Sequence, residues 1–146
     1  YRNCRVHKFT TKGDLLFSWG EPGEGPGEFQ LVHSVWEYKD RVFVADRQNN
    51  RLQVFTLEGQ HLDTWPGFLQ PCKIFIANDM IYVAELGARV SILDLQGNIL
   101  ARWGGERSHA PGDFWAPHGI WADSQGDVYV SEVLEGRRVQ KFHRTR

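Results

Sequence analysis

RVHKFTTKGDLLFSW (residues 5–19), RLQVFTLEGQHLDTW (51–65) and RVSILDLQGNILARW (89–103) are three copies of one pattern, and a fourth copy begins at residue 138 with RVQKF. In each full copy, alternating apolar and polar residues lead into a turn that contains glycine, and a second apolar segment ends in tryptophan. Alternation indicates a half-buried strand, and a glycine turn between two such strands is typical of a β-hairpin. The sequence therefore predicts a recurring hairpin.

A second pair of strands lies between these hairpins. The segments HSVWEYKDRVFVAD (33–46), CKIFIANDMIYVAE (72–85) and HGIWADSQGDVYVSE (118–132) each hold two apolar stretches around a polar turn, and each ends in an acid. Four strands in a unit of roughly 40–50 residues is the period of a β-propeller blade. A β-sandwich does not require such regular copies, and a leucine-rich solenoid has a shorter period. We therefore expect an all-β propeller of four-stranded blades.

The copies make residues 1–146 one partial propeller of about three blades, with repeat units at about 5–50, 51–88 and 89–137 and a fourth begun at 138. The chain starts with the third strand of one blade and ends with the third strand of another. Open sheet stacks expose apolar faces, so we expect either self-association that completes the propeller or a fragment of a longer protein. The two third-strand copies would compete in a two-chain ring, which favours the fragment slightly.

Composition narrows the possible partners. The net charge of -1 gives no electrostatic reason to expect nucleic acid or anionic lipid. No apolar run approaches the roughly 20 residues that cross a bilayer, and no signal peptide is visible, so we expect a soluble protein of unknown location that binds no membrane. The two cysteines, Cys4 and Cys72, form no disulfide framework.

The starts of the innermost strands hold the residues with the most chemistry. These strands begin near the axis of a propeller, and the matched positions are His33, Cys72 and His118, which lie 13, 13 and 14 residues before the matched acids. Nitrogen and sulfur ligands of this kind suit Zn²⁺. The structural alternative is that Cys72 is a small buried residue and that the histidines bond to carbonyl groups of neighbouring blades.

The repeat also predicts structural roles for arginine and tryptophan. We expect the recurring arginines to pair with the acid of the adjacent strand, and the tryptophans that end the hairpins to pack between blades. Trp115 lies near the start of an innermost strand and is a candidate to line a ligand pocket, with plain packing as the equal alternative. The arginines are Arg5, Arg51, Arg89 and Arg138, the acids are Asp46, Glu85 and Glu132, and the tryptophans are Trp19, Trp65 and Trp103.

WGEPGEGPGEF (19–29), VFVADRQNNRLQVF (42–55) and the long segment at 103–132 resemble the NHL-repeat signature, in the same order and over nearly the whole chain. The resemblance implies a six-bladed propeller, of which this chain provides about half. Within this family, YRNCRVHKF (1–9), with the QLVHS, ADRQN and APHGI segments that follow it, is similar to the C-terminal half of the peptidyl-α-hydroxyglycine α-amidating lyases and their bacterial relatives.

Those lyases split a carbinolamide into a peptide amide and glyoxylate, with a zinc ion held by three histidines on the propeller axis. The resemblance implies that His33 and His118 are two of these histidines, that Tyr1 is the proposed catalytic base, and that Arg47 faces the substrate. Zinc would polarise the carbinol oxygen, an arginine would hold the carboxylate, and a deprotonated tyrosine would take the proton. The implied ligand is peptide-like.

The chain also departs from the lyase pattern. The third zinc histidine would lie upstream of Tyr1, Gly119 replaces an aspartate that binds calcium, and Phe43, Val54 and Arg2 stand where the family has cysteines. We therefore expect zinc but not calcium, and a lyase that is incomplete or inactive alone. Whether the chain is an enzyme stays open. The alternative is a non-catalytic NHL scaffold that binds a protein, peptide or other ligand; a lactonase-type hydrolase is weaker, since it needs acids or asparagines on the axis.

Overall fold

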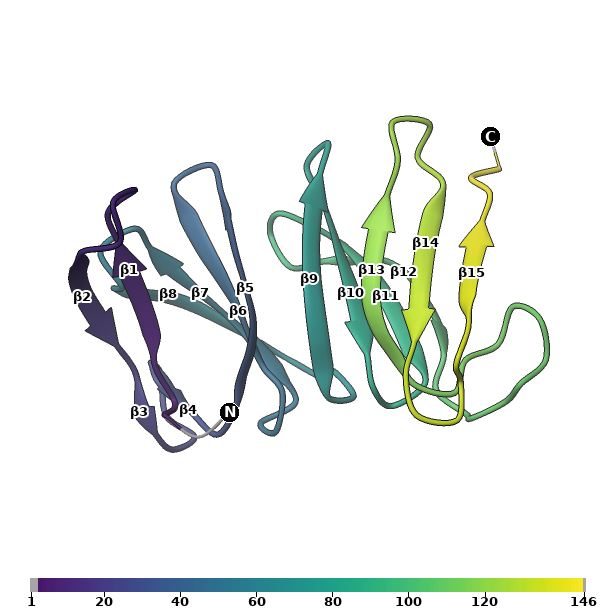
Figure 1. Cartoon of the computed structure of the whole chain (residues 1–146), viewed down its shortest axis with the longest axis horizontal. Coiled ribbons are helices and arrows are strands. Elements are labelled where there is room, and N and C mark those ends of the chain that lie inside the picture. The colour runs from purple at the N-terminus through teal and green to yellow at the C-terminus, as the bar shows by residue number, and fades with distance from the viewer. Residues whose placement is uncertain (1–2, 146) are drawn as a thin grey trace.

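The computed structural model describes residues 3–145, which form β-strands joined by turns and linkers (Figure 1). Within these residues, no helix has the length and hydropathy that a bilayer crossing requires. The strands are β1 (Val6–Phe9), β2 (Leu15–Trp19), β3 (Glu21–Pro22), β4 (Glu28–Phe29), β5 (Val32–Tyr38), β6 (Arg41–Asp46), β7 (Arg51–Thr56), β8 (His61–Pro66), β9 (Pro71–Ala77), β10 (Met80–Glu85), β11 (Arg89–Asp94), β12 (Ile99–Gly104), β13 (Pro117–Ala122), β14 (Val128–Glu132) and β15 (Val139–Phe142).

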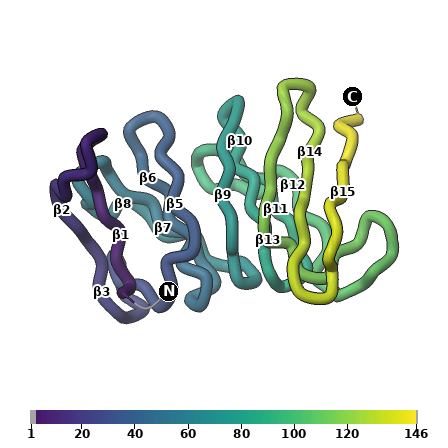
Figure 2. The backbone as a smooth tube through the Cα atoms, in the orientation of Figure 1, coloured from purple at the N-terminus to yellow at the C-terminus, as the bar shows by residue number. Residues whose placement is uncertain are grey.

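Two of the sheets are complete blades. Strands β5 to β8 and strands β9 to β12 each form a four-stranded antiparallel sheet in chain order. The β1–β2 hairpin lies at one end of the row of sheets and the three-stranded sheet β13–β14–β15 at the other, while β3 and β4 form a short parallel pair (Figure 2). The predicted all-β propeller of four-stranded blades is therefore confirmed. Self-association, or continuation in a longer protein, stays a prediction.

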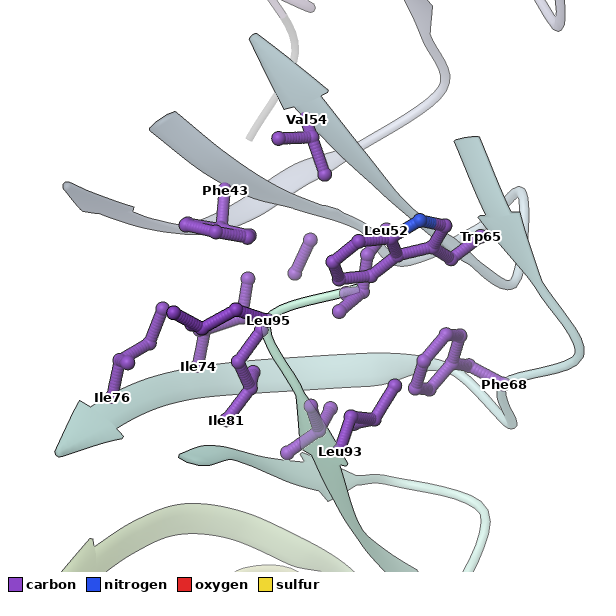
Figure 3. Packing of buried hydrophobic residues seen from close by; sticks show 12 residues of the cluster. Phe43, Leu52, Val54, Trp65, Phe68, Ile74, Ile76, Ile81, Leu93 and Leu95 are labelled. Carbon is purple, nitrogen blue, oxygen red and sulfur yellow. The ribbon is translucent and has the colours of Figure 1, made fainter. Parts of the chain in front are cut away.

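The core fills the spaces between blades. One cluster joins the sheet β5–β8 to the sheet β9–β12 and includes Phe43, Leu52 and Ile74, all 0% exposed (Figure 3). On β9, Ile74 and Ile76 belong to this cluster, whereas the intervening Phe75 belongs to a second cluster against the sheet β13–β15. Successive strand residues point to opposite faces. The unbroken apolar run of β9 therefore follows from a blade covered on both faces.

Tryptophan and glycine form the same contact in two successive blades. A Cβ atom added to Gly59 would lie 2.8 Å from the Trp19 ring, and one added to Gly97 would lie 2.5 Å from the Trp65 ring. Each tryptophan thus lies against the hairpin turn of the following blade. Trp103 contacts Phe142 on β15, with ring centroids 5.5 Å apart. These contacts confirm the predicted packing of the tryptophans between blades.

The predicted arginine–acid pairs form at three places. Arg51 binds Asp46 at 2.8 Å, Arg89 binds Glu85 at 2.6 Å, and Arg138 binds Glu132. All three acid side chains are 0% exposed. Arg5, the remaining arginine of the pattern, is exposed. Because a buried carboxylate is costly unless it is paired and hydrogen-bonded, each pair depends on its complete set of partners.

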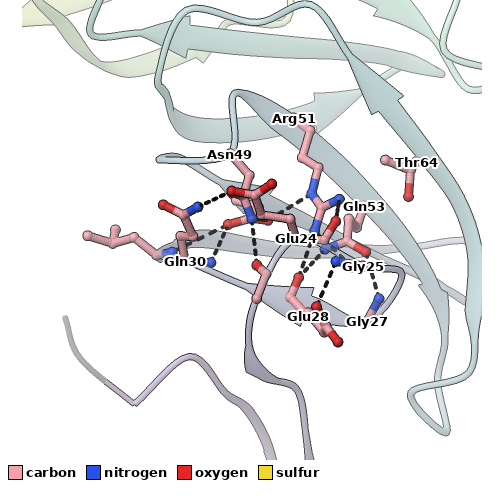
Figure 4. A network of polar contacts seen from close by, with 12 residues as sticks. Glu24, Gly25, Gly27, Glu28, Gln30, Asn49, Arg51, Gln53 and Thr64 are labelled. Carbon is pink, nitrogen blue, oxygen red and sulfur yellow. Dashed lines mark hydrogen bonds and ion pairs between the residues drawn. The ribbon is translucent and has the colours of Figure 1, made fainter.

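The arginines also hold the long linkers between blades. Arg51 donates to the carbonyl oxygens of Gly25 and Glu28, both at 2.9 Å (Figure 4). Gln53, two residues further along β7, donates to the Glu28 carbonyl at 2.7 Å and accepts from the Gly27 amide at 2.9 Å. The side chains of one strand therefore replace the backbone partners that an irregular linker lacks.

Arginine and glutamine side chains hold the linker of residues 104–116 in the same way. Arg138 and Gln140 both donate to the Asp113 carbonyl oxygen at 2.7 Å, and the Gly112 amide donates to Gln140 at 2.9 Å. The linker between β8 and β9 is much shorter, and Ser91 stands at the place of the glutamine and donates to Glu85. In β7, β11 and β15, glutamine is therefore present where the preceding linker is long, and serine replaces it where the linker is short.

We expect Glu132 to make the folded state sensitive to acid. Burial alone would raise the pKa of its carboxyl, but hydrogen bonds from Arg138 and from the Trp115 and Ala116 amides outweigh burial and lower that pKa. The stabilisation is present above the ordinary carboxyl pKa and is lost as pH falls through the lowered value. Urea unfolding from neutral to acid pH should show a smaller acid-induced loss of stability in Glu132→Gln than in the unmodified chain. An equal loss in both would contradict this role of Glu132.

Candidate functional site

A β-bulge recurs at the start of all three innermost strands that the structure describes. The pairing of β5 with β6 skips His33, the pairing of β9 with β10 skips Cys72, and the pairing of β13 with β14 skips His118. A bulge re-aims the side chain of the extra residue and leaves it outside the ladder. The same β-bulge therefore turns the side chain of each candidate ligand away from the strand ladder of its own blade.

These bulges bring three potential ligand atoms together. One ring nitrogen of His33, one of His118 and the sulfur of Cys72 all lie within 4.8 Å of one another. The two imidazole rings meet edge to face, with centroids 4.9 Å apart. Cys72 is 1% exposed, and both histidines are partly buried. The structure thus assembles the residues that spacing alone had aligned, while metal binding itself stays a prediction.

The buried acids position this cluster through the backbone. Each acid lies opposite the residue just before the bulge, and its carboxylate accepts amide protons from the preceding turn. Asp46 accepts from Leu31 at 3.3 Å, and Glu132 accepts from Trp115 at 2.5 Å and from Ala116 at 3.2 Å. The acids therefore fix the direction in which the chain enters each innermost strand.

One hydrogen bond sets the orientation of His33. Its Nδ1 lies 2.7 Å from the carbonyl oxygen of Cys72, on the neighbouring blade. A carbonyl oxygen only accepts, so Nδ1 is the donor and the lone pair is on Nε2. This contact is the one that the structural alternative predicts. It is also the usual arrangement of a metal-binding histidine, whose second nitrogen donates to a carbonyl or carboxylate group.

The surroundings keep both histidines neutral at neutral pH. Burial lowers the pKa of His33 and of His118. The hydrogen bond to the Cys72 carbonyl opposes this at His33, the positive charge of Arg47 lowers the pKa of both histidines, and the net direction is downward for each. For Cys72, burial raises the thiol pKa, and Arg47 acts in the opposite direction. Neutral imidazole is the form that binds a metal ion, so the two histidines are ready to act as ligands without losing a proton.

Arg47 lies beside the cluster, while the substrate-facing role that the resemblance implies stays a prediction. Its amide donates to the Leu31 carbonyl at 2.9 Å, and its charge acts on His33, Cys72 and His118. The matched positions in the next two blades hold Leu86 and Val133, whose amides make the equivalent bonds at 2.9 and 3.0 Å. Of these three matched positions, only the first therefore brings a charge to the axis.

The remaining predicted site residues, Tyr1 and Trp115, are not members of the cluster that the described residues form. Tyr1 lies outside the described residues. Trp115 stacks on His109 at a centroid distance of 4.5 Å and lies 5.7 Å from the Arg107 guanidinium carbon, so its neighbours come from its own linker. Its role as a pocket wall stays a prediction. Gly119 provides no carboxylate at the position where the lyases have their calcium-binding aspartate, and the absence of calcium stays a prediction.

Ser34 is a positioning residue that sequence reasoning did not identify. It follows His33, is 8% exposed, and its hydroxyl accepts the Ile74 amide proton at 3.1 Å. The bond joins β5 to β9 directly beside the bulges. A single serine in a strand has no distinctive pattern, so only the approach of the two blades reveals this role.

Comparisons with known proteins identify relatives of the whole chain, although no family model matches it. Human NHL repeat-containing protein 3 is 34% identical over 155 residues, covering 96% of this chain and 43% of that protein. Rat peptidylglycine alpha-amidating monooxygenase is 27% identical over 163 residues, covering 91% of this chain and 15% of that protein. The WD40 repeats of RRP9 superpose with a TM-score of 0.71 at 15% identity, covering 97% of this chain and 46% of that one, and this likeness concerns the fold alone. The chain thus spans less than half the length of these relatives.

Proposed function

Because this chain belongs to the NHL-repeat family of β-propellers, we propose that it contributes His33 and His118 to an axial zinc centre of the amidating-lyase type. Such a centre cleaves the C–N bond of a peptidyl-α-hydroxyglycine. The chain covers 15% of the rat amidating protein, so the proposal concerns what these residues contribute to such a centre and not the activity of a whole protein.

One observation carries the proposal: two histidines from separate blades, with a cysteine from the blade between them, have ligand atoms within 4.8 Å of one another. Tetrahedral zinc bonds of about 2.0–2.3 Å place ligand atoms roughly 3.5 Å apart, so a side-chain movement of about 1 Å would close the site. The neutral imidazoles also suit a dication. The residues present therefore fit the metal.

Each group has a distinct part in the proposed chemistry. When bound, zinc supplies a Lewis acid that polarises an oxygen of the substrate. The Arg47 guanidinium, which acts electrostatically on both histidines, suits the carboxylate of the glycine end of a peptide. The partly buried position of the histidines lowers the local dielectric constant, which strengthens the attraction between Arg47 and that carboxylate. Tyr1 is the candidate base by resemblance.

A non-catalytic scaffold is the second candidate function. It is favoured by the His33 bond to the Cys72 carbonyl, since that bond gives the histidine a role in joining blades without any metal. The human relative, at 34% identity, is named only for its repeats. In this alternative, the same axis would bind a protein or peptide without chemistry.

Metal content separates the two functions. We expect the chain, produced with added zinc and then dialysed, to retain about one zinc per chain by mass spectrometry. The double variant His33→Ala/His118→Ala should retain almost none, because it removes both nitrogen ligands. The matched control is His7→Ala/His143→Ala, which removes two exposed histidines. A chain without zinc, or a His33→Ala/His118→Ala variant that keeps its zinc, would favour the scaffold.

A further inference from the structure

We propose that Cys72 is the third protein ligand of the axial metal, so that this chain alone provides a centre of two histidines and one thiolate. The inference rests on the proposed function and extends it, because the resemblance assigns only histidines to the metal and places the third one outside this chain. A cysteine in place of a third histidine changes the set of ligand atoms and therefore the metal ions that the site prefers.

The position of Cys72 supports this role. Strand β9 packs against both β5 and β13, the two strands that carry the histidines. Cys72 is the residue skipped by the bulge of β9, as His33 and His118 are skipped in their strands. The bulge leaves the Cys72 side chain outside the ladder of its own blade, and its sulfur lies within 4.8 Å of a ring nitrogen of each histidine. The thiol is therefore presented in the same way as the two imidazoles.

Charge balance gives an independent reason. The imidazole side chains of His33 and His118 and the Arg47 guanidinium provide no negative charge for a dication. The buried acids of the described residues, Asp46, Glu85 and Glu132, are already bound to arginines and to backbone amides. The potential metal-binding cluster found among residues 3–145 consists of His33, Cys72 and His118. Cys72 is the one member of this cluster that can become an anion. On binding, the thiol releases its proton to solvent and the sulfur lone pair forms the bond to the metal.

A sulfur ligand also predicts metal preference. Thiolate and imidazole together favour Zn²⁺ and similar transition-metal ions, whereas Mg²⁺ and Ca²⁺ require oxygen ligands. Cys72 is 1% exposed, which protects a thiolate ligand from oxidation. We therefore expect Co²⁺ to replace zinc and to report on its ligands through its absorption spectrum.

The test is a Co²⁺ titration of the full 146-residue chain, reduced and freed of metal with a chelator. We expect a sulfur-to-cobalt charge-transfer band in the near ultraviolet together with visible ligand-field bands. Cys72→Ser should lose the charge-transfer band and bind Co²⁺ more weakly by at least about tenfold. Cys4→Ser is the matched control, because Cys4 is the other cysteine of the chain, and it should keep the band.

The outcomes separate this inference from the proposed function. Ligand-field bands without a charge-transfer band would leave a histidine metal site and overturn the role of Cys72. A charge-transfer band that persists in Cys72→Ser would also overturn it. No Co²⁺ binding at all would overturn both proposals. Because Cys72 is buried, Cys72→Ala serves as a second variant, and urea unfolding of both variants checks that the fold is retained; loss of the band in a folded variant supports the inference.

Discussion

Replacing Asp46 with alanine is expected to destabilise the chain by about 3–5 kcal/mol, a large part of the stability of a typical domain. The Asp46 carboxylate is 0% exposed and accepts hydrogen bonds from Gln30 at 3.1 Å, Leu31 at 3.3 Å, Asn49 at 2.7 Å and Arg51 at 2.8 Å. Alanine would leave the Arg51 charge, 11% exposed, without its ion-pair partner. Urea unfolding followed by tryptophan fluorescence measures the change.

The matched control is an acid at the surface. Asp79 pairs with Lys39 at 2.6 Å, but both side chains are more than half exposed. Asp79→Ala should therefore destabilise the chain much less than Asp46→Ala does, even though it also removes the Tyr38 hydrogen bond and an aspartate with a positive φ. A second control, Asp46→Ala/Arg51→Met, should be less destabilised than the sum of its single changes, because no unpaired charge remains. Similar losses in Asp46→Ala and Asp79→Ala would mean that the buried pair is not the main support of the blade.

Gly104→Ala is expected to be the second severe change, at about 2–5 kcal/mol. Gly104 has a φ of +89°, and an added Cβ would lie 2.2 Å from the Ala88 carbonyl oxygen. That oxygen also accepts the Gly105 amide proton at 2.8 Å, so it has little freedom to retreat. The substitution therefore combines backbone strain with a collision against backbone atoms at the edge of a complete blade.

Gly13 provides a control with almost the same backbone strain. Its φ is +93°, and nothing lies within 4 Å of an added Cβ. Gly13→Ala should cost only the conformational strain, about 1–2 kcal/mol. The difference between the two variants in urea unfolding therefore measures the collision with Ala88. Equal losses at the two sites would show that the contact relaxes without cost.

The sequence by itself determined the blade architecture, because strand alternation and turn glycines are local properties that repeat along the chain. The pairing of Arg89 with Glu85 could be predicted for the same reason: the two residues flank one tight turn and face each other across adjacent strands. The alignment of His33, Cys72 and His118 also followed from their fixed spacing to the acids.

Only the tertiary structure decided how closely these aligned residues meet. The bond between His33 and the Cys72 carbonyl and the Ser34 bridge to Ile74 both depend on how separate blades pack against each other. Such contacts join residues about 40 positions apart, and they depend on sheet twist and core volume rather than on any local pattern. Spacing therefore identified the candidate ligands, and the packing of the blades brought their ligand atoms within 4.8 Å of one another.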